Sequence, residues 1–107
     1  MMFVHAFLIS WKREVTDEQI SRYKSELFAL RKEIPGFVDA CFGRKVDSGG
    51  GKFTHGGAVL FESLDSLRAA ETHPGHEALG AFVMPLISEF QTFDLQVSSA
   101  STEGSGS

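Results

Sequence analysis

The order in which strand-like and helix-like segments follow one another restricts the fold of this chain more than any other feature of its sequence. Residues 3–11 read FVHAFLISW, which predicts a strand buried on both faces. Strand patterns also occur over 37–46, 53–63 and 90–97. Helical spacing occurs over 16–34 and, in two pieces, over 64–72 and 74–85. This βαββαβ order predicts an α+β, ferredoxin-like fold, in which a four-stranded antiparallel sheet carries two helices on one face.

Local signals indicate where the helices begin and end. Thr16 and Gln19 form the pattern of a capping box, and Pro35-Gly36 stops the first helix. We expect Ser63 to cap the next helical segment and Pro74 to occupy the first turn of the one after it.

Two glycine-rich stretches surround the start of the third strand. The loop DSGGGK at 47–52 is not expected to bind nucleotide phosphates, because its lysine precedes Phe53 and a strand rather than a helix. It is expected to join two strands of a hairpin. Gly56-Gly57, inside the third strand, predicts a bulge or a place where another group approaches the backbone closely.

Chain length and composition predict one domain that pairs with a copy of itself. The chain has 107 residues, and 42% of them are hydrophobic, which is enough for a core. We expect the domain to span residues 1–97 and the small polar residues 98–107 to form a disordered tail. Helices on one side leave the other sheet face bare although it is apolar, which predicts a homodimer through the sheet face.

The balance of charges argues against several classes of partner. The formal net charge is −4 and the acids and bases are interspersed, so neither nucleic acid nor a membrane is expected to bind. The first residues contain no basic leader and no apolar run long enough to span a bilayer, which predicts a cytoplasmic protein. Cys41 is the single cysteine, and we expect a buried, reduced thiol.

Histidines in two strands are candidates for chemistry. His5 and His55 each interrupt an apolar strand face, so both rings can point into one cavity if their strands are neighbours. An imidazole with an ordinary pKa of about 6.5 can accept a proton at neutral pH and return it. The alternative is that both are buried histidines with a structural role.

The segment THPGH carries the other two histidines. His73 is expected to bind the last carbonyls of the preceding helix, whereas His76, just inside the next helix, is the better candidate for proton transfer. With His55 they could form a zinc site, but the HExxH pattern is absent and we expect no metal. Glu71 and Asp94 are expected to be solvated or capping acids.

Several of these motifs together resemble one family. His5, IPGF at 34–37, FTH at 53–55 and HPGH at 73–76 occur in the order and spacing of the stress-responsive A/B barrel family, also called Dabb. The resemblance covers residues 3 to about 97. It implies a dimeric α+β barrel with a cleft between the sheet and the helices of each subunit.

The resemblance also implies which residues form the site. A plant branch of the family contains cofactor-free polyketide cyclases and hydroxynitrile lyases, in which the histidines matching His55 and His76 carry the acid/base chemistry. Substrate contacts are expected from four residues around the same cleft, His5, Tyr23, Gly57 and His73.

Three functions are compatible with these observations. The first is a cofactor-independent cyclase, lyase or isomerase that acts on a small carbonyl or phenolic compound. The second is a non-catalytic stress-responsive or ligand-binding homodimer. The third is a haem- or quinol-type monooxygenase of the related barrel superfamily, in which a helix histidine binds haem. Leu27 and Ala70 stand where the cyclase branch has substrate-orienting tyrosines, which sets this chain apart from that branch.

Overall fold

The computed structural model describes residues 2–100, so Met1 and positions 101–107 of the predicted tail lie outside it. The four strands are β1 (Met2–Trp11), β2 (Phe37–Arg44), β3 (His55–Phe61) and β4 (Ile87–Val97). The helices are α1 (Asp17–Ala29), α2 (Leu64–Glu71) and α3 (Pro74–Val83), with 3-10 turns η1 (Leu30–Lys32) and η2 (Met84–Leu86). None of the helices in the described part has the length and apolar character needed to cross a bilayer.

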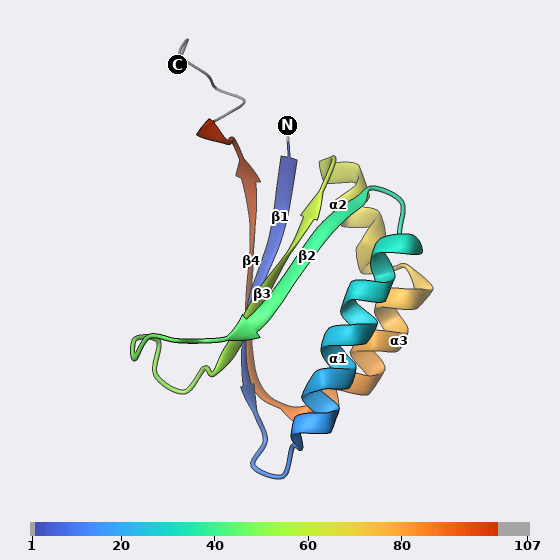
Figure 1. Cartoon of the computed structure of the whole chain (residues 1–107). Coiled ribbons are helices and arrows are strands. Elements are labelled where there is room, and N and C mark those ends of the chain that lie inside the picture. The colour runs from blue at the N-terminus through green and yellow to red at the C-terminus, as the bar shows by residue number, and fades with distance from the viewer. Residues whose placement is uncertain (1, 101–107) are drawn as a thin grey trace.

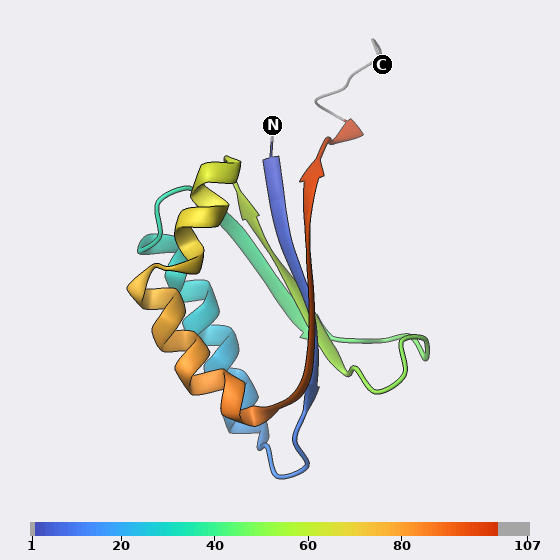
Figure 2. The same cartoon turned by 180° about the vertical axis from the view of Figure 1, so that it is seen from behind.

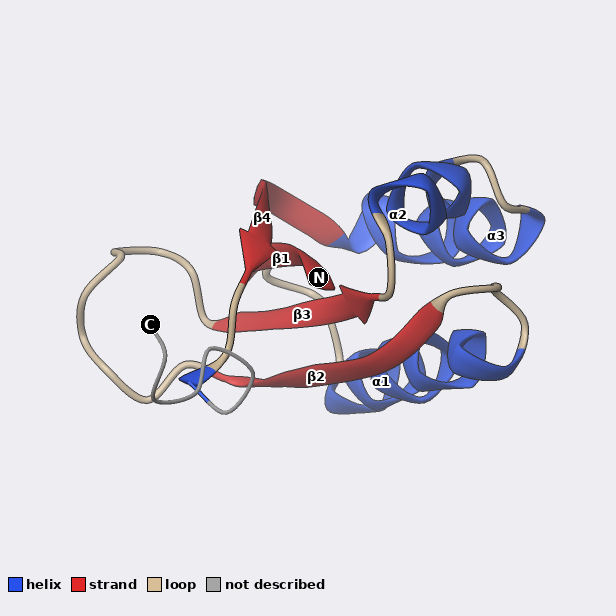
Figure 3. Ribbon diagram, turned by 90° about the horizontal axis from the view of Figure 1, so that it is seen from above, coloured by secondary structure: helices blue, strands red, loops and turns tan. Residues whose placement is uncertain are grey.

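The strands form one antiparallel sheet in the order β2-β3-β1-β4. All three helices cover one face of this sheet and leave the other face open (Figure 1, Figure 2). Seen from above, α1 lies beside β2, and α2 and α3 form a pair next to it (Figure 3). The expected α+β, ferredoxin-like fold is confirmed, with the second helical region divided in two as its sequence indicates.

The helices begin where their capping residues predict. The Thr16 hydroxyl accepts a hydrogen bond from the Gln19 amide, and the Gln19 side chain accepts one from the Thr16 amide, which completes the capping box. Ser63 caps α2 by accepting from an amide in its first turn. Pro74 is the first residue of α3, where its missing amide proton has no helical partner to lose.

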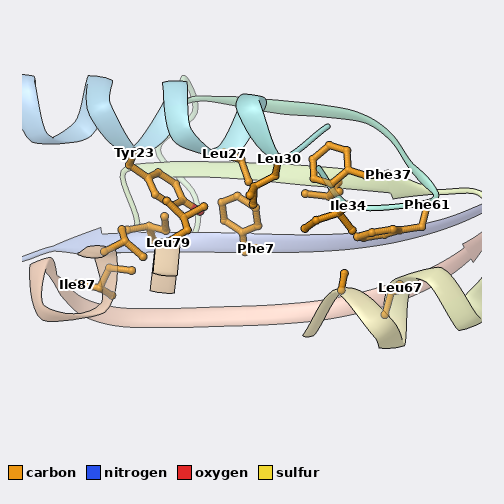
Figure 4. Packing of buried hydrophobic residues seen from close by; sticks show 14 residues of the cluster. Phe7, Tyr23, Leu27, Leu30, Ile34, Phe37, Phe61, Leu67, Leu79 and Ile87 are labelled. Atoms are coloured by element: carbon orange, nitrogen blue, oxygen red, sulfur yellow. The ribbon is translucent and has the colours of Figure 1, made fainter. Parts of the chain in front are cut away.

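The core lies between the sheet and the helices. Phe7 projects from the middle of β1 toward α1, where Leu27 and Leu30 lie beside it (Figure 4). The Phe7 ring also contacts the rings of Tyr23 and Phe42, with centroids 6.4 and 6.5 Å away. These aromatic and leucine side chains hold α1 against β1 and β2, and three of them, Phe7, Tyr23 and Leu27, also line the cavity described below.

Gly57 in β3 is explained by the close approach of another group and not by a bulge. Gly57 and Phe7 are cross-strand partners, and the pairing of β1 with β3 runs through them without a register shift. A Cβ atom at position 57 would lie 2.7 Å from the Phe7 ring and 2.4 Å from the carbonyl oxygen of Cys41. Glycine is therefore required because the Phe7 ring crosses β3 at this point.

The open face of the sheet exposes apolar side chains. Phe93 and Leu95 of β4 lie on this face, and each keeps 48% of its surface exposed. Cys41 of β2 is also on this face and is exposed, so the expected buried thiol is wrong for the single chain. The expectation failed because the alternation along β2 directs Phe42, and not Cys41, toward the helices, where it contacts Tyr23.

Candidate active site

A cavity of about 320 Å³ lies between the sheet and the helices. Its walls come from β1, β3 and β4 on one side and mainly from α1, α2 and α3 on the other. Most lining side chains are apolar, among them Phe7, Leu27, Leu67, Ala70, Leu79 and Phe90. The polar lining residues are His5, Tyr23, Glu71, His76 and Thr92. A cavity of this size and character suits a small, mostly apolar molecule that is oriented by a few polar contacts.

His5 reaches the cavity from β1 and is held by a carboxylate from β4. His5 and Asp94 are directly opposed in the register of these strands, and Nδ1 of His5 lies 2.7 Å from Oδ1 of Asp94. An ionised carboxylate only accepts hydrogen bonds, so the proton of the neutral ring lies on Nδ1. Nε2 is left as a proton acceptor. The two side chains are 32% and 47% exposed, so this pair orients the ring more than it stabilises the fold.

His76 reaches the mouth of the same cavity from the first turn of α3. Its Nδ1 lies 3.2 Å from the carbonyl oxygen of Glu71, the last residue of α2. A carbonyl oxygen can only accept, so Nδ1 of the neutral ring carries the proton and Nε2 is again the free acceptor. His5 and His76 therefore bring the same tautomer to one cavity from two distant parts of the sequence.

Tyr23 lines the cavity from α1 and is buried. Its hydroxyl has no hydrogen-bond partner in residues 2–100. Burial raises the pKa of the Tyr23 phenol well above its usual range, so the group stays protonated at physiological pH. A protonated phenol at an apolar cavity can donate a hydrogen bond to a carbonyl oxygen of a ligand.

His55 does not line this cavity. It is opposed to Ile9 of β1, four residues from His5, which places it roughly 13 Å from the level of His5 along the sheet. Its ring stacks on Phe42 with a centroid distance of 5.6 Å, and its Nδ1 accepts a hydrogen bond from Trp11 Nε1 at 3.0 Å. The expected convergence of three imidazoles is therefore wrong for His55, because a strand pattern predicts the face of a side chain but not its level along the strand.

The His55 ring has the opposite tautomer. Trp11 Nε1 can only donate, so Nδ1 is the acceptor and the proton of the neutral ring lies on Nε2. Burial lowers the pKa of His55, the Arg44 guanidinium lowers it further, and Asp17 acts in the opposite direction. The ring is therefore a neutral hydrogen-bond donor at neutral pH.

Two other expected site residues lie outside the lining of the cavity. His73 is the N-cap of α3, and its Nδ1 accepts a hydrogen bond from the Gly75 amide at 3.0 Å. It caps the start of α3 and not, as expected, the end of α2, because Pro74 starts a new helix at this point. Gly57 lies under Phe7 and borders the open face of the sheet.

Metal ligation finds no support in this arrangement. No group of three His, Cys, Asp or Glu side chains within residues 2–100 is placed to hold a metal ion. The three histidines that a zinc site would need, His55, His73 and His76, do not form such a group.

Asp94 is the site residue that the sequence analysis missed. The sequence predicts a solvated or capping acid, whereas the structure makes Asp94 the partner of His5. The alternation in FQTFDLQV is a signal that could have placed Phe90, Thr92 and Asp94 on one strand face. The pairing with His5 depends on the register between β1 and β4, for which the sequence has no local motif.

Solved structures share this fold over almost the whole chain. A dimeric ferredoxin-like protein of unknown function from Thermobifida fusca YX has a TM-score of 0.78 and 24% identity, over 91% of this chain and 92% of that one. A protein from Arabidopsis thaliana has a TM-score of 0.84 and 21% identity, over 91% and 96%. A hydroxynitrile lyase from Passiflora edulis has a TM-score of 0.83 and 14% identity, over 91% and 94%. At these identities the likeness shows the fold alone.

Sequence comparison identifies the family. A comparison with curated proteins finds no match. Residues 3–97, which include every strand and helix from the second residue of β1 to the end of β4, match the Stress Responsive A/B Barrel Domain. This chain therefore belongs to the stress-responsive A/B barrel (Dabb) family.

Proposed function

We propose that this protein is a cofactor-independent acid/base enzyme, of the cyclase, lyase or isomerase type, that acts on a small carbonyl or phenolic compound in the cavity. One observation carries the proposal. His5 and His76 come from different elements to one apolar cavity, and each has its Nδ1 bound to an acceptor and its Nε2 free. Free Nε2 atoms beside an apolar space are suited to proton transfer at neutral pH.

In this proposal, His5 and His76 move the protons. Nε2 of either ring takes a proton from an acidic carbon or hydroxyl of the ligand and later returns it. Asp94 is a positioning residue, because it holds the tautomer of His5 and stabilises the positive charge that forms on the ring. Tyr23 donates a hydrogen bond to the carbonyl oxygen, on which negative charge develops.

His55 is left out of the proton transfers, although the resemblance gives it a catalytic role. Its ring lies outside the lining of the cavity, and its Nδ1 is occupied by Trp11. Replacement of His55 is therefore the natural control for replacement of the other two histidines.

The cavity wall limits the kind of ligand. Leu27 and Ala70 are buried and line the cavity at the positions where the cyclase branch has tyrosines. Apolar side chains therefore take the place of hydroxyl groups at these two positions, while Tyr23 keeps a hydroxyl on the α1 side. A ligand that presents apolar surface to Leu27 and Ala70 fits best, because an unpaired polar group there would lose its hydrogen bonds to water.

Exchange of carbon-bound protons tests the proposal without knowledge of the natural substrate. The probe is a panel of small aryl ketones, such as phenylacetone, incubated with the protein in D2O and followed by proton NMR. The protein should accelerate the loss of the α-proton signals, and His5→Asn and His76→Asn should abolish most of that acceleration. Asparagine keeps a donor near the position of Nδ1 but removes Nε2. Binding of the panel without exchange would favour the non-catalytic ligand-binding protein, and a Soret band after haem titration would favour the monooxygenase.

We also propose that two copies pair through the open face of the sheet. Phe93 and Leu95 expose apolar surface there, and the similar protein from Thermobifida fusca YX is dimeric. Light scattering should give twice the 11.7 kDa mass of the chain. Leu95→Glu should shift the protein to the monomer, whereas Ala69→Glu on the exposed side of α2 should not. A monomeric mass for the unmodified protein at micromolar concentration would refute the pairing.

A further inference from the structure

A second pocket, of about 170 Å³, lies between α1 and the end of the β2–β3 pair. Its polar lining residues are Ser21 and Lys24 of α1, Arg44 of β2 and His55 of β3. It shares no lining residue with the main cavity. Phe42 lines this pocket and Tyr23 lines the main cavity, and their ring centroids are 5.3 Å apart, so these two rings form the partition.

Positive charge is in excess at the second pocket. Lys24 and Arg44 have no ion-pair partner in the part of the chain that the structure describes. Arg44 is directly opposed to His55 across β2 and β3, so both side chains leave the sheet on the helix-facing side. Asp17, near the start of α1, is the one carboxylate whose charge acts on His55. Among the described residues, the lining of the pocket therefore contains two cationic side chains, Lys24 and Arg44, and no carboxylate.

His55 supplies an unused donor to the same pocket. Only 8% of its surface is exposed, and its Nδ1 is occupied by Trp11 and by the Thr54 hydroxyl at 2.9 Å. The proton on Nε2 has no acceptor within residues 2–100. None of the buried side-chain nitrogen and oxygen atoms in the described residues lacks a partner, so this N–H is open to solvent at the pocket and can donate to an incoming acceptor.

We propose that this pocket binds a small oxyanion, namely a carboxylate or phosphate group. His55 Nε2 and the Ser21 hydroxyl donate hydrogen bonds to its oxygens, and Lys24 and Arg44 neutralise its charge. The pocket volume of about 170 Å³ accommodates a group of this size. The site does not depend on the acid/base function proposed for the main cavity.

Trp11 makes the site directly observable. It is the single tryptophan of the chain, and its indole donates to the ring that is expected to contact the anion. Inorganic phosphate and acetate are titrated separately at constant ionic strength, with chloride as the compensating anion, and tryptophan fluorescence and the His55 ring signals in NMR are recorded. At least one of the two anions should give a saturable change in the millimolar range, and the responding anion identifies the group that the site prefers.

Three variants decide whether the response comes from this pocket. Arg44→Ala and Lys24→Ala should each weaken binding roughly tenfold, because each removes a charge-assisted contact. Arg68→Ala removes one positive charge from the surface of α2, away from the pocket, and should leave the midpoint unchanged. Arg44→Gln replaces Arg44→Ala if the latter lowers the melting temperature. Equal midpoints in Arg44→Ala and Arg68→Ala, a response that chloride reproduces, or no saturable response to either anion would overturn the proposal.

Discussion

The main cavity and the second pocket use histidine in opposite ways. At the cavity, Nδ1 of His5 donates a hydrogen bond to Asp94 and Nδ1 of His76 donates one to the Glu71 carbonyl, so Nε2 of each ring is free to accept. At the pocket, Nδ1 of His55 accepts from Trp11, so Nε2 donates. The chemical role of each imidazole is therefore decided by the partner of its other nitrogen.

Burial alone would rank these histidines differently. His55 is the most buried of the three, and a group whose pKa is changed by burial is one candidate for a catalytic base. Its donor partner removes it from that role, whereas His76 is exposed at the cavity mouth and keeps a free Nε2. In the proposed function, the hydrogen-bond partner and not the degree of burial therefore selects His5 and His76 as the proton-transfer groups.

The strongest test of this contrast replaces each histidine by asparagine. His5→Asn and His76→Asn should each slow α-proton exchange by about 10²–10⁴-fold, because general acid/base groups supply rate enhancements of that order. His55→Asn should leave the rate within about twofold, because its ring lies outside the cavity lining. The NMR exchange assay measures all three. An equal loss in His55→Asn, with an unchanged melting temperature, would break the contrast.

A smaller effect is expected when the partner of His5 is changed. Asp94→Asn removes the negative charge that stabilises the protonated ring, and it should lower kcat for exchange about tenfold with little change in KM. Glu62→Gln, an exposed carboxylate that lines neither site, is the matched control. A rise in KM at constant kcat would show instead that Asp94 acts in binding.

At the second pocket, removing the hydrogen-bond partner of His55 should lower the stability of the fold. Trp11→Phe keeps the aromatic ring but removes the donor to His55 Nδ1, so it should lower the free energy of unfolding by about 1 kcal/mol. Urea denaturation followed by circular dichroism measures the change. In a His55→Asn background, Trp11→Phe should change the free energy of unfolding by a different amount, because the two side chains interact. Strict additivity would show that the hydrogen bond contributes nothing to stability.

The smallest expected effect is a change of stability with pH. The folded protein holds the pKa of His55 below its ordinary value, so the unfolded chain binds more protons and stability rises with pH in this range. The contribution is complete above the unfolded pKa of about 6.5 and is lost as the pH falls toward the folded pKa. Urea midpoints at about pH 7.5 and about pH 5.5 should differ less in His55→Asn than in the unmodified protein.

Neighbouring charges should change that pH effect in opposite directions. Arg44→Ala removes a group that lowers the pKa of His55 and should reduce the pH dependence, whereas Asp17→Asn should increase it. If the pH dependence of stability changed in the same direction in both variants, it would be determined by the net charge of the protein and not by the surroundings of His55.

The features that the sequence predicted depend on residues within one or two turns of chain. The capping box of Thr16 and Gln19, the Ser63 cap and the helix start at Pro74 are all local, and all are confirmed. The order of the segments then restricts the topology, because antiparallel hairpins and right-handed crossovers leave few arrangements. For this reason the fold could be predicted from the sequence.

The chemistry of the site was harder to predict because it depends on register. A slide of two residues between β1 and β4 would keep every side chain on its face but would give His5 a different partner from Asp94. In the same way, alternation placed His55 on the helix-facing side but did not reveal that it is opposite Ile9. The partner of each histidine, and with it the tautomer, therefore appeared only in three dimensions.

The break between α2 and α3 determines how the His76 ring is held beside the cavity. In an unbroken α-helix the Glu71 carbonyl would receive the amide proton of Gly75. The Gly75 amide instead donates its hydrogen bond to Nδ1 of His73, and Pro74 has no amide proton. The carbonyl of Glu71 is therefore left to accept the hydrogen bond from Nδ1 of His76. In a variant such as Pro74→Ala that allowed a continuous helix, the Gly75 amide would bind the Glu71 carbonyl. The His76 ring would then lose its acceptor, so the helix backbone and the imidazole compete for one oxygen atom.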